Sequence, residues 1–435
     1  PMRILHQWIY NQPSLTRFAQ DFLEIHPAES NLYLVGGLVR DVLLNLDTSN
    51  NDYDLMVEQS TEEELSRSLA ILKDKGQINA FFKVGKSFPV YKIQFRDRAI
   101  EMDLALARKE RSTGIGHSQF EVESSGITAF EDAKRRDFTV NALFVRFFQK
   151  QDGIGWNLID SFEGQTDLKT RTLRAVGNAE DRMSEDPLRI LRAIRFVHQK
   201  GFHLEDSLKD VILRYGREWI PTVSPDRIQE EFLKTMVVDL KSAFGDYLRL
   251  NLLDAAFPKL KPFLPKKANP IPENASLPVD FSVELVFPTL LTPWLAGVNF
   301  QPSPGALRNL EGILRAYHIP SPRRTRTLLA NLCSLCCRDT TPYPHSIQEK
   351  ILNSATGKDC RFLYEVYSAE YGMRELDNLT NPPPRISGQE LIAWGFKPCR
   401  GLEDIVLQAR ELQWQGTANL EEIKERLLAQ FTDET

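Results

Sequence analysis

Hydrophobic and polar residues alternate in two different ways along the chain, and the change divides it into two regions. Between residues 31 and 174, short apolar runs separated by amphipathic segments predict strands at 32–35, 52–57, 90–95 and 100–107. After residue 174, apolar residues recur at helical spacing, as in 185–198 and 226–240. We therefore predict an α+β domain followed by an all-α region.

Prolines indicate how the helical region is organised. Residues 258–322 hold 12 of the 25 prolines, so we expect short helices joined by rigid turns there. A second run, at 381–384, precedes a last helical segment that begins near Ser387. The helical region is thus expected to comprise several separate parts.

Composition excludes some classes of protein. The 435 residues are 42% hydrophobic, and no stretch approaches ~20 uninterrupted apolar residues, so we predict no membrane span. A net charge of −5 at pH 7 argues against a protein coated in positive charge for indiscriminate nucleic-acid binding. Any RNA contact must come from a local patch. The five cysteines are an odd count in a long chain, which favours reduced thiols and a cytoplasmic location.

Two aspartates two residues apart carry the first candidate chemistry. Alternate residues of a strand project from the same face, so Asp52 and Asp54 can reach one point in space. Carboxylates are the hard oxygen ligands that Mg²⁺ prefers, and two such ions can activate a hydroxyl and neutralise a leaving pyrophosphate. Asp103, on the later apolar run 101–105, is a candidate third carboxylate. An isolated Asp-x-Asp is more often a solvated turn.

A glycine pair lies between an apolar strand and a helical pattern. Gly36 and Gly37 follow the run 32–35 and precede the helical residues 38–44. Glycines there allow a tight turn and a close approach of backbone N–H groups to phosphate oxygens. Arg40, in the first turn of that helix, can reach the same phosphates. The glycine pair lies about 15 residues before the aspartate pair, and this placement favours a phosphate-binding turn over a simple turn.

The next motif combines cations with an acceptor. Arg136 follows Arg135 and precedes Asp137 and an apolar stretch. Guanidinium groups suit phosphate, and the carboxylate of Asp137 can accept a hydrogen bond from a ribose hydroxyl, which favours ribonucleotides. A surface Arg-Arg-Asp salt bridge is the alternative.

The last of these motifs bears on the choice of base. At i and i+3 on a predicted helix, Asp186 and Arg189 are neighbours and present an acceptor and a donor to one flat object. Cytosine and adenine offer an amino donor beside a ring-nitrogen acceptor, whereas guanine and uracil offer the reverse, so one pair can accept C and A. Glu185 can steady the pair, and Arg192 and Arg195 continue the spacing toward a triphosphate. An ordinary helix salt bridge is the alternative.

The order of these motifs resembles the class II tRNA nucleotidyltransferase and bacterial poly(A) polymerase family. The resemblance covers roughly residues 30 to 240, and 386–398 resembles the family's tail, whereas 258–380 matches it poorly. The segments that carry it are 34–41, the Asp52 and Asp54 pair, 135–142, 160–174, 185–196 and 226–232.

The resemblance implies a polymerase-β-like nucleotidyltransferase head followed by an all-α neck, body and tail. The expected division is a helical extension at 1–30, the catalytic head at 31–174, a base-recognising neck at 175–240, and RNA-binding body and tail at 241–380 and 381–435. It also implies that nucleotide and metal are held by Gly37, Arg40, Asp52, Asp54, Arg136, Asp186, Arg189, Arg192 and Arg195.

The implied activity is addition of C, C and A to the 3′ end of tRNA from CTP and ATP, using two Mg²⁺ ions and releasing pyrophosphate. The terminal ribose hydroxyl attacks the α-phosphate, with Asp52, Asp54 and Asp103 as the catalytic carboxylates. The tRNA 3′ end is the expected partner, with no membrane and no obligate protein partner. In the family a flexible segment after the third carboxylate adapts the site to C and A; here it corresponds to 108–126, which holds Gly114, Gly116 and Gly126.

Other activities on this fold stay open. An A-adding enzyme and a poly(A) polymerase share these motifs. A CC-adding enzyme is disfavoured because relatives of that kind are short between the third carboxylate and the Arg-Arg-Asp motif, and 104–134 is of full length. A catalytically silent RNA-binding protein is disfavoured by the intact aspartate pair.

Overall fold

A computed structural model describes most of the chain, and these residues form two compact units. The first unit comprises Pro1–Glu231 and Leu250–Ala255, and the second Phe232–Arg249 and Ala256–Thr435. The structure describes residues 2–49, 52–85, 89–95, 101–112, 120–123, 126–266, 271–272, 277, 281–298, 301–303, 305–336, 344–371, 386–398, 401–415 and 419–431. Gly114 and Gly116, and the proline run at 381–384, lie outside them.

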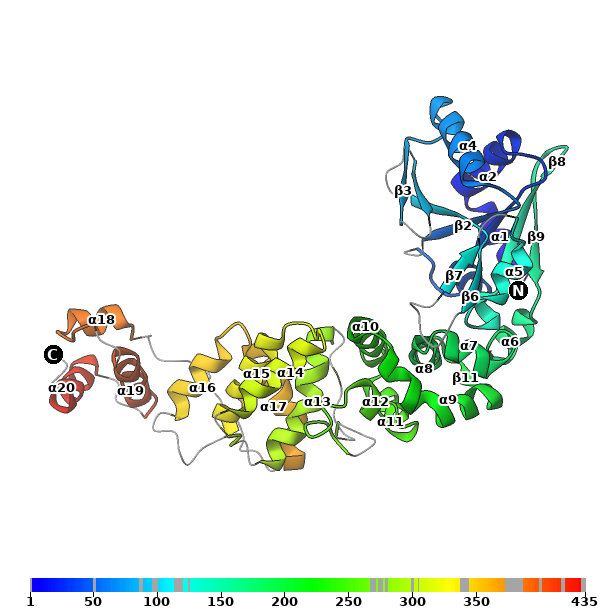
Figure 1. Cartoon of the computed structure of the whole chain (residues 1–435). Coiled ribbons are helices and arrows are strands. Elements are labelled where there is room, and N and C mark those ends of the chain that lie inside the picture. The colour runs from blue at the N-terminus through cyan, green and yellow to red at the C-terminus, as the bar shows by residue number, and fades with distance from the viewer. Residues whose placement is uncertain are drawn as a thin grey trace. The chain divides into compact units, whose positions relative to one another are not determined.

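A mixed seven-stranded sheet organises the first unit (Figure 1). Its strand order is β3-β4-β5-β2-β1-β8-β9, and β2 and β5 run parallel while the other neighbours run antiparallel. The strands are β1 (Asn31–Val35), β2 (Tyr53–Glu58), β3 (Ala80–Val84), β4 (Val90–Gln94), β5 (Glu101–Leu106), β8 (Leu143–Lys150) and β9 (Gly153–Asp160). The predicted strands at 32–35, 52–57, 90–95 and 100–107 correspond to β1, β2, β4 and β5.

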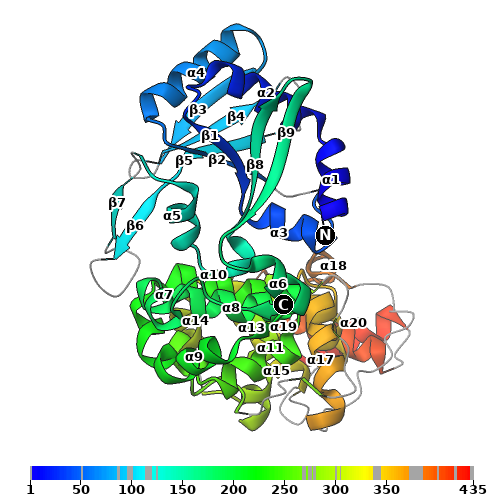
Figure 2. The same ribbon diagram turned by 90° about the vertical axis from the view of Figure 1, so that its right-hand side faces the viewer.

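Helices and a small hairpin complete the α+β part. Helix α4 (Glu62–Asp74) begins at a capping box formed by Thr61 and Glu64, and α5 (Ala129–Lys134) begins at one formed by Thr128 and Glu131. Figure 2 shows the β6–β7 hairpin beside the main sheet, close to α5. The remaining elements here are α1 (Met2–Tyr10), α2 (Pro13–Ile25), α3 (Gly37–Leu43), β6 (Lys109–Ser112), β7 (Phe120–Glu123) and α6 (Gly164–Thr170).

The rest of the first unit is almost entirely helical. Helix α8 (Leu188–Lys200) buries Ile190, Leu191 and Ile194, and it ends at Gly201 in a left-handed conformation. After this cap, β11 (His203–Leu204) pairs in parallel with β10 (Thr172–Leu173). The other helices of this part are α7 (Ala179–Glu185), α9 (Asp206–Trp219) and α10 (Pro225–Met236), which is shared with the second unit from Phe232 on.

The second unit is built from helices around two apolar cores. The first core contains the fully buried aromatic rings of Phe232, Tyr247, Phe257 and Phe287, which meet mostly edge to face. Its helices are α11 (Leu240–Arg249), α12 (Leu253–Ala256, shared with the first unit), α13 (Val283–Gly297), α14 (Ala306–Ala316), α15 (Pro322–Cys336), α16 (Pro344–Leu352) and α17 (Gly357–Tyr371).

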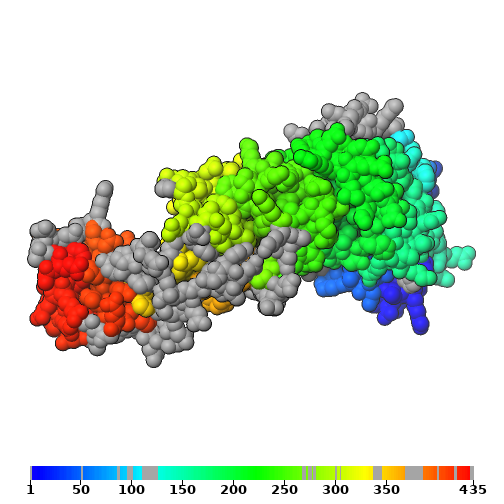
Figure 3. Space-filling view, turned by 90° about the horizontal axis from the view of Figure 1, so that it is seen from below, coloured from blue at the N-terminus to red at the C-terminus, as the bar shows by residue number. Residues whose placement is uncertain are grey.

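The last three helices of the second unit have a core of their own. These are α18 (Gly388–Ala393), α19 (Leu402–Trp414) and α20 (Leu420–Gln430). Figure 3 shows the surface that they form together, coloured orange to red. Their buried residues are Ile386, Leu391, Phe396, Ile405, Ala409, Ile423 and Leu427. The predicted fold class, an α+β head followed by helical parts, is confirmed, with the addition of the two-residue strand β11.

Two local predictions were wrong. The helix expected at 185–198 is broken at Asp186, which has extended backbone angles, because Pro187 disfavours a helical conformation in the residue before it. In the proline-rich segment, α13 runs for 15 residues with Pro288 and Pro293 inside it. The Thr292 hydroxyl donates to the carbonyl of Pro288 within this helix.

No helix in the described part of the chain combines the length and the apolar character needed to cross a membrane.

Candidate active site

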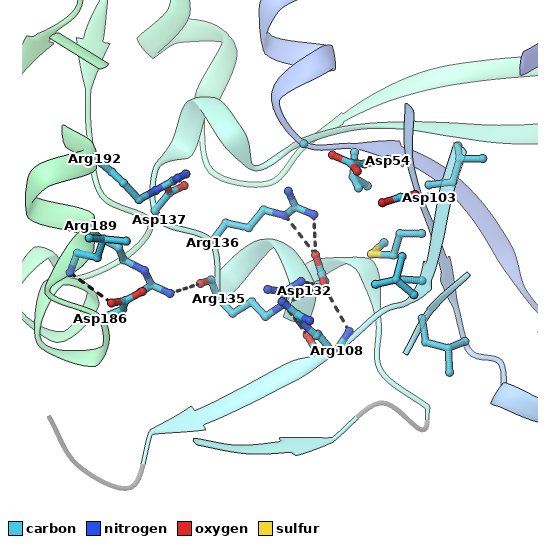
Figure 4. A pocket seen from close by; sticks show the side chains of 18 of the residues that line it. Asp54, Asp103, Arg108, Asp132, Arg135, Arg136, Asp137, Asp186, Arg189 and Arg192 are labelled. Carbon is cyan, nitrogen blue, oxygen red and sulfur yellow. Dashed lines mark hydrogen bonds and ion pairs between the residues drawn. The ribbon is translucent and has the colours of Figure 1, made fainter. Parts of the chain in front are cut away.

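A cavity of about 480 Å³ in the first unit brings residues of all the sequence motifs together (Figure 4). Strands β2 and β5 form one wall and α5, with the turn after it, forms another. The start of α8 and Arg227 of α10 complete the lining. Besides Gly36, the charged residues that line it are Asp54, Asp103, Arg108, Asp132, Arg135, Arg136, Asp137, Asp186, Arg189, Arg192 and Arg227.

Two carboxylates face each other across the parallel strands. The register of β2 and β5 pairs Asp54 with Asp103. Burial, followed by the charge of Asp103, raises the pKa of Asp54 to about 6 despite the opposing charge of Arg136. Asp103 accepts two hydrogen bonds from Lys92 of β4, at 2.9 and 3.0 Å. A cation at this point would relieve the repulsion between the two carboxylates.

Asp52 has a different position from the other two acids. It immediately precedes β2, its side chain is exposed, and it does not line the cavity. Its charge nevertheless contributes to the raised pKa of Asp54. The described residues contain no group of three or more His, Cys, Asp or Glu side chains arranged to hold a metal ion. The donor set at the cavity is therefore Asp54 and Asp103, with Asp52 close by.

Gly36 lies against the carboxylate of Asp54. Its φ of +84° lies in a region that other residues rarely adopt, and a Cβ added to it would lie 2.9 Å from the Asp54 Oδ2 atom. Only glycine therefore fits between β1 and α3 at this point. Gly37 begins α3, as the strand-turn-helix pattern predicted.

Arg40 does not line the cavity. Its side chain is buried, donates to both carboxylate oxygens of Asp41 at 2.8 and 2.9 Å and to the Asn141 Oδ1 atom at 2.6 Å, and lies over the ring of Phe196. Lys200 also donates to Asp41, at 3.2 Å. Arg40 thus connects α3 with the turn before β8, and its contact with phosphate stays a prediction.

Arg136 lies between the acid pair and α5. Its guanidinium donates to the Asp132 Oδ2 atom at 3.1 and 3.2 Å and lies over the ring of Phe144. The charge of Arg136 also lowers the pKa of Asp54, so the guanidinium is electrostatically coupled to the carboxylate pair. This is a suitable position for a cation that contacts a phosphate near a metal.

Asp137 is buried and forms an ion pair with the half-buried Arg192. Arg192 donates to the Asp137 Oδ2 atom at 2.9 and 2.7 Å, and Asn141 donates to Oδ1 at 2.8 Å. Burial alone would raise the pKa of Asp137, but Arg192 and Asn141 hold it well below its usual range. Asp137 is therefore an ionised acceptor at the cavity wall.

The predicted base-reading pair has a partner that its sequence spacing did not indicate. Asp186 accepts from both terminal nitrogens of Arg227, at 3.2 and 2.7 Å. Arg189 donates instead to the carbonyl oxygens of Arg182 and Arg135, at 2.8 and 3.0 Å. Asp186 and Arg189 both line the cavity, although Asp186 precedes the helix on which Arg189 lies.

Glu185 and Arg195 hold neighbouring groups in position. Glu185 accepts from Arg189 at 2.9 Å and from Arg182 at 2.5 Å, and its role in steadying the base-reading pair stays a prediction. Arg195 donates to Glu231 of α10 at 2.6 Å and does not line the cavity. The role of Arg195 in binding a nucleotide stays a prediction.

Sequence reasoning missed three polar residues of the cavity region. Asp132 could have been found, because it precedes Arg135 and Arg136 by three and four residues, the spacing of helix neighbours. Lys92 lies opposite Asp103 only through strand pairing. Arg227 is 41 residues from Asp186, and nothing in local spacing links the two.

Comparisons with known proteins identify this part of the chain. Residues 32–174 match the family of the Poly A polymerase head domain, so this segment is a domain of that family. The CCA-adding enzyme of Lactobacillus delbrueckii subsp. bulgaricus is 34% identical over 231 residues, covering 53% of this chain and 52% of the relative. The chain therefore spans about half the length of the curated relatives that it matches.

Solved structures share the fold over almost the whole chain. The complex of a CCA-adding enzyme with CTP has a TM-score of 0.65 at 20% identity and covers 100% of this chain and 98% of that one. The Thermotoga maritima CCA-adding enzyme complexed with tRNA has a TM-score of 0.60 at 20% identity, covering 96% and 94%. The family resemblance predicted from the motifs is thus confirmed, and at these identities the structures establish the fold.

Proposed function

We propose that this protein is a CCA-adding tRNA nucleotidyltransferase, which transfers C, C and A from CTP and ATP to the 3′ end of tRNA and releases pyrophosphate. The observation that carries the proposal is the cavity itself. A repelling carboxylate pair lies on one side, arginines line the middle, and the Asp186 and Arg189 pair lies on the other side. These are the three regions that a metal-bound triphosphate and its base require.

The carboxylates are the proposed ligands for two Mg²⁺ ions. The oxygen-only donor set, the repulsion between Asp54 and Asp103, and the close fit of Gly36 against Asp54 all suit hard divalent cations. When bound, such ions lower the pKa of the attacking ribose hydroxyl and neutralise charge on the leaving pyrophosphate. Asp52, which precedes β2, would complete the ligand set. Lys92 would then either share the Asp103 carboxylate with an ion or give up its hydrogen bonds to it.

The arginines and glycines are the proposed triphosphate contacts. Arg136 lies beside the acid pair, and Arg192 lines the cavity next to the ionised Asp137. Asp137 would accept a hydrogen bond from a ribose hydroxyl. The turn at Gly36 and Gly37 brings backbone N–H groups close to the same place. Arg40 and Arg195 could contribute only by sharing donors that already bind Asp41 and Glu231.

Asp186 and Arg189 are the proposed readers of the base. The carboxylate of Asp186 would accept from the amino group of cytosine or adenine, and Arg189 would donate to the adjacent ring nitrogen. Arg227 donates to both oxygens of this carboxylate, so a base would share the Asp186 acceptors with Arg227. A uracil or guanine edge would present an oxygen to Asp186 and a donor to Arg189, and both contacts would be repulsive.

The wider organisation follows from the same proposal. We assign catalysis to 31–174 with base recognition at 175–240, and tRNA binding to 241–380 and 381–435. Support comes from the shared fold of the Thermotoga maritima enzyme, whose complex contains tRNA. The location that suits this activity is the cytoplasm.

The experiment is an extension assay on tRNA that lacks all three terminal nucleotides. We expect three additions with CTP plus ATP, and two with CTP alone. Extension only of tRNA ending in C-C would identify an A-adding enzyme, and a stop after two nucleotides despite ATP would identify a CC-adding one. A long ladder of A on unrelated RNA would identify a poly(A) polymerase, and no transfer at all would favour a silent RNA-binding protein.

A further inference from the structure

Asp132 is a buried carboxylate in the cavity wall to which the motifs assigned no role. It lies on α5, and its side chain is 1% exposed. It accepts hydrogen bonds from Arg135 at 2.9 and 2.6 Å, from Arg136 at 3.2 and 3.1 Å, and from the backbone N–H of Arg108 at 3.3 Å. One carboxylate thus holds two guanidinium groups and the chain that leads from β5 into β6.

The two arginines that Asp132 holds lead to opposite ends of the cavity. Arg136 lines the cavity together with Asp54 and Asp103 and lies beside this acid pair (Figure 4). The backbone carbonyl of Arg135 accepts from the Arg189 guanidinium at 3.0 Å, so it fixes the proposed base reader (Figure 4). Arg135 also donates to the carbonyl of Arg108 at 3.1 Å. The phosphate side and the base side of the cavity therefore share one buried anchor.

Asp132 is suited to this position because it is ionised. Burial would raise the pKa of its carboxyl, but the charges of Arg136 and Arg135 lower it below the usual value. Arg135 donates two hydrogen bonds to Oδ1 and Arg136 donates two to Oδ2. An asparagine would direct an N–H₂ donor at one of these guanidinium groups, so it could satisfy one arginine but not both.

We propose that Asp132 is a positioning residue that sets, through Arg136 and the Arg135 carbonyl, both the affinity for the nucleotide triphosphate and the selection of its base. The proposal rests on the proposed function for the identity of the nucleotides. The proposal predicts that a substitution of Asp132, which lies outside the base-reading motif, changes both the affinity for the nucleotide and the selection of its base.

The test compares Asp132→Asn with a matched control at a buried carboxylate that contacts the same helix. Glu58 is a buried carboxylate that accepts from the backbone N–H of Ala129, at the start of α5, at 2.6 Å, and it does not line the cavity. Glu58→Gln therefore disturbs the anchoring of α5 without touching Arg135 or Arg136. Circular dichroism and thermal unfolding report whether each variant folds.

Two measurements are made on each folded variant. The first is the dissociation constant of ATP in the presence of Mg²⁺, obtained by calorimetry, which does not depend on transfer. The second is the ratio of correct to incorrect nucleotide incorporation, with UTP competing against CTP on tRNA that lacks its three terminal nucleotides. For Asp132→Asn we expect about a tenfold weakening of ATP binding and about a tenfold loss of selectivity, the lower end of what loss of a supporting residue costs a preorganised site.

Asp132→Glu should restore part of both properties, because it keeps the charge and both acceptors. A folded Asp132→Asn protein with unchanged affinity and selectivity would overturn the proposal, as would equal losses in Glu58→Gln. Should Asp132→Asn not fold, Arg135→Lys, which removes the guanidinium fork but keeps the charge, is expected to lower selectivity, and unchanged selectivity would contradict the proposal. A wild-type protein that binds ATP but transfers nothing to tRNA would contradict the proposed function alone, and the calorimetric comparison would still stand.

Discussion

Each of the two units contains a cluster of acidic side chains, and the two clusters differ in how the charges of their acids are compensated. In the second unit, Glu411 of α19 accepts from the backbone N–H groups of His345 and Ser346 at 3.0 Å each, and from the His345 Nδ1 atom at 2.7 Å. Glu349 accepts from Arg410 and from the Trp414 Nε1 atom. Each of these acids is satisfied by donors of its own cluster, as expected of groups that hold α16 against α19.

The cavity of the first unit is not balanced in this way. Asp54 lies opposite Asp103 in neighbouring strands, and its pKa is raised to about 6. Such an arrangement costs folding free energy, and a site that binds cations recovers that cost when the cation binds. The comparison suggests that a polar cluster whose acids repel one another is a better indicator of function than a cluster that is merely polar.

The largest expected effect concerns the acid pair. Asp54→Ala should lower nucleotide transfer by at least about a thousandfold while the circular dichroism spectrum is unchanged, because loss of a metal ligand removes several kcal/mol of charge stabilisation. Glu411→Gln should leave the rate of the chemical step near that of the wild type. Single-turnover assays with tRNA measure this rate, and an Asp54→Ala protein of near wild-type rate would refute the metal assignment.

The next effect concerns the base reader. Asp186→Ala should weaken discrimination against UTP and GTP by ~1–3 kcal/mol, the scale of one bidentate base contact. Arg227→Ala should give a smaller loss in the same direction, because it releases the Asp186 carboxylate without removing it. Competition between CTP and UTP on a single tRNA measures the ratio. If misincorporation of UTP and GTP stayed at the wild-type level in both variants, Asp186 and Arg227 would form only a structural ion pair.

A stability effect is expected in the second unit. Glu411→Ala removes the acceptor of the buried Ser346 N–H and of the partly buried His345 N–H, and Glu411 is only 3% exposed. The free energy of unfolding should fall by about 2–3 kcal/mol. Denaturant titration followed by tryptophan fluorescence reports it, since Trp414 lies in the same cluster. A change below about 0.5 kcal/mol would show that water replaces the lost acceptor.

For Asp54→Asn in metal-free protein we expect the free energy of unfolding to rise, the opposite of the effect of Glu411→Ala. The pKa of Asp54 is about 6 in the folded state and near 3.8 in the unfolded state, so between these values the folded state binds more protons and its stability falls as pH rises. Asparagine removes this cost. Asp54→Asn should therefore match the wild type below about pH 4 and exceed it by ~1–3 kcal/mol above pH 6, measured by urea unfolding in a chelator. A variant less stable than the wild type at pH 8 would contradict the repulsion between the carboxylates.

The strands and motif residues that depend on a local sequence pattern could be predicted from the sequence. Strand runs such as 32–35 and the motif residues Asp54 and Arg189 could be recognised because period, spacing and residue type are all local properties. The break at Asp186 was missed although Pro187 follows it, because the apolar helical period continued on the far side.

What could not be predicted depends on tertiary contacts. The pairing of Arg227 with Asp186 requires α10 to pack against the start of α8, and Lys92 reaches Asp103 only through the antiparallel register of β4 and β5. Arg40 was expected near phosphate from its position in the first turn of a helix. In the structure its guanidinium donates to Asp41 and Asn141, contacts that depend on where the turn before β8 lies, and its contact with phosphate stays a prediction.

The most direct test of the central claim, that the acid pair is balanced by bound cations, is the thermal stability of the protein with and without Mg²⁺ at pH 8. We predict that saturating Mg²⁺ with ATP raises the Tm of the wild type and of Glu411→Gln, and that Asp54→Asn, although more stable without metal, gains far less from the ions. Equal stabilisation of the wild type and Asp54→Asn by Mg²⁺ and ATP would contradict the claim.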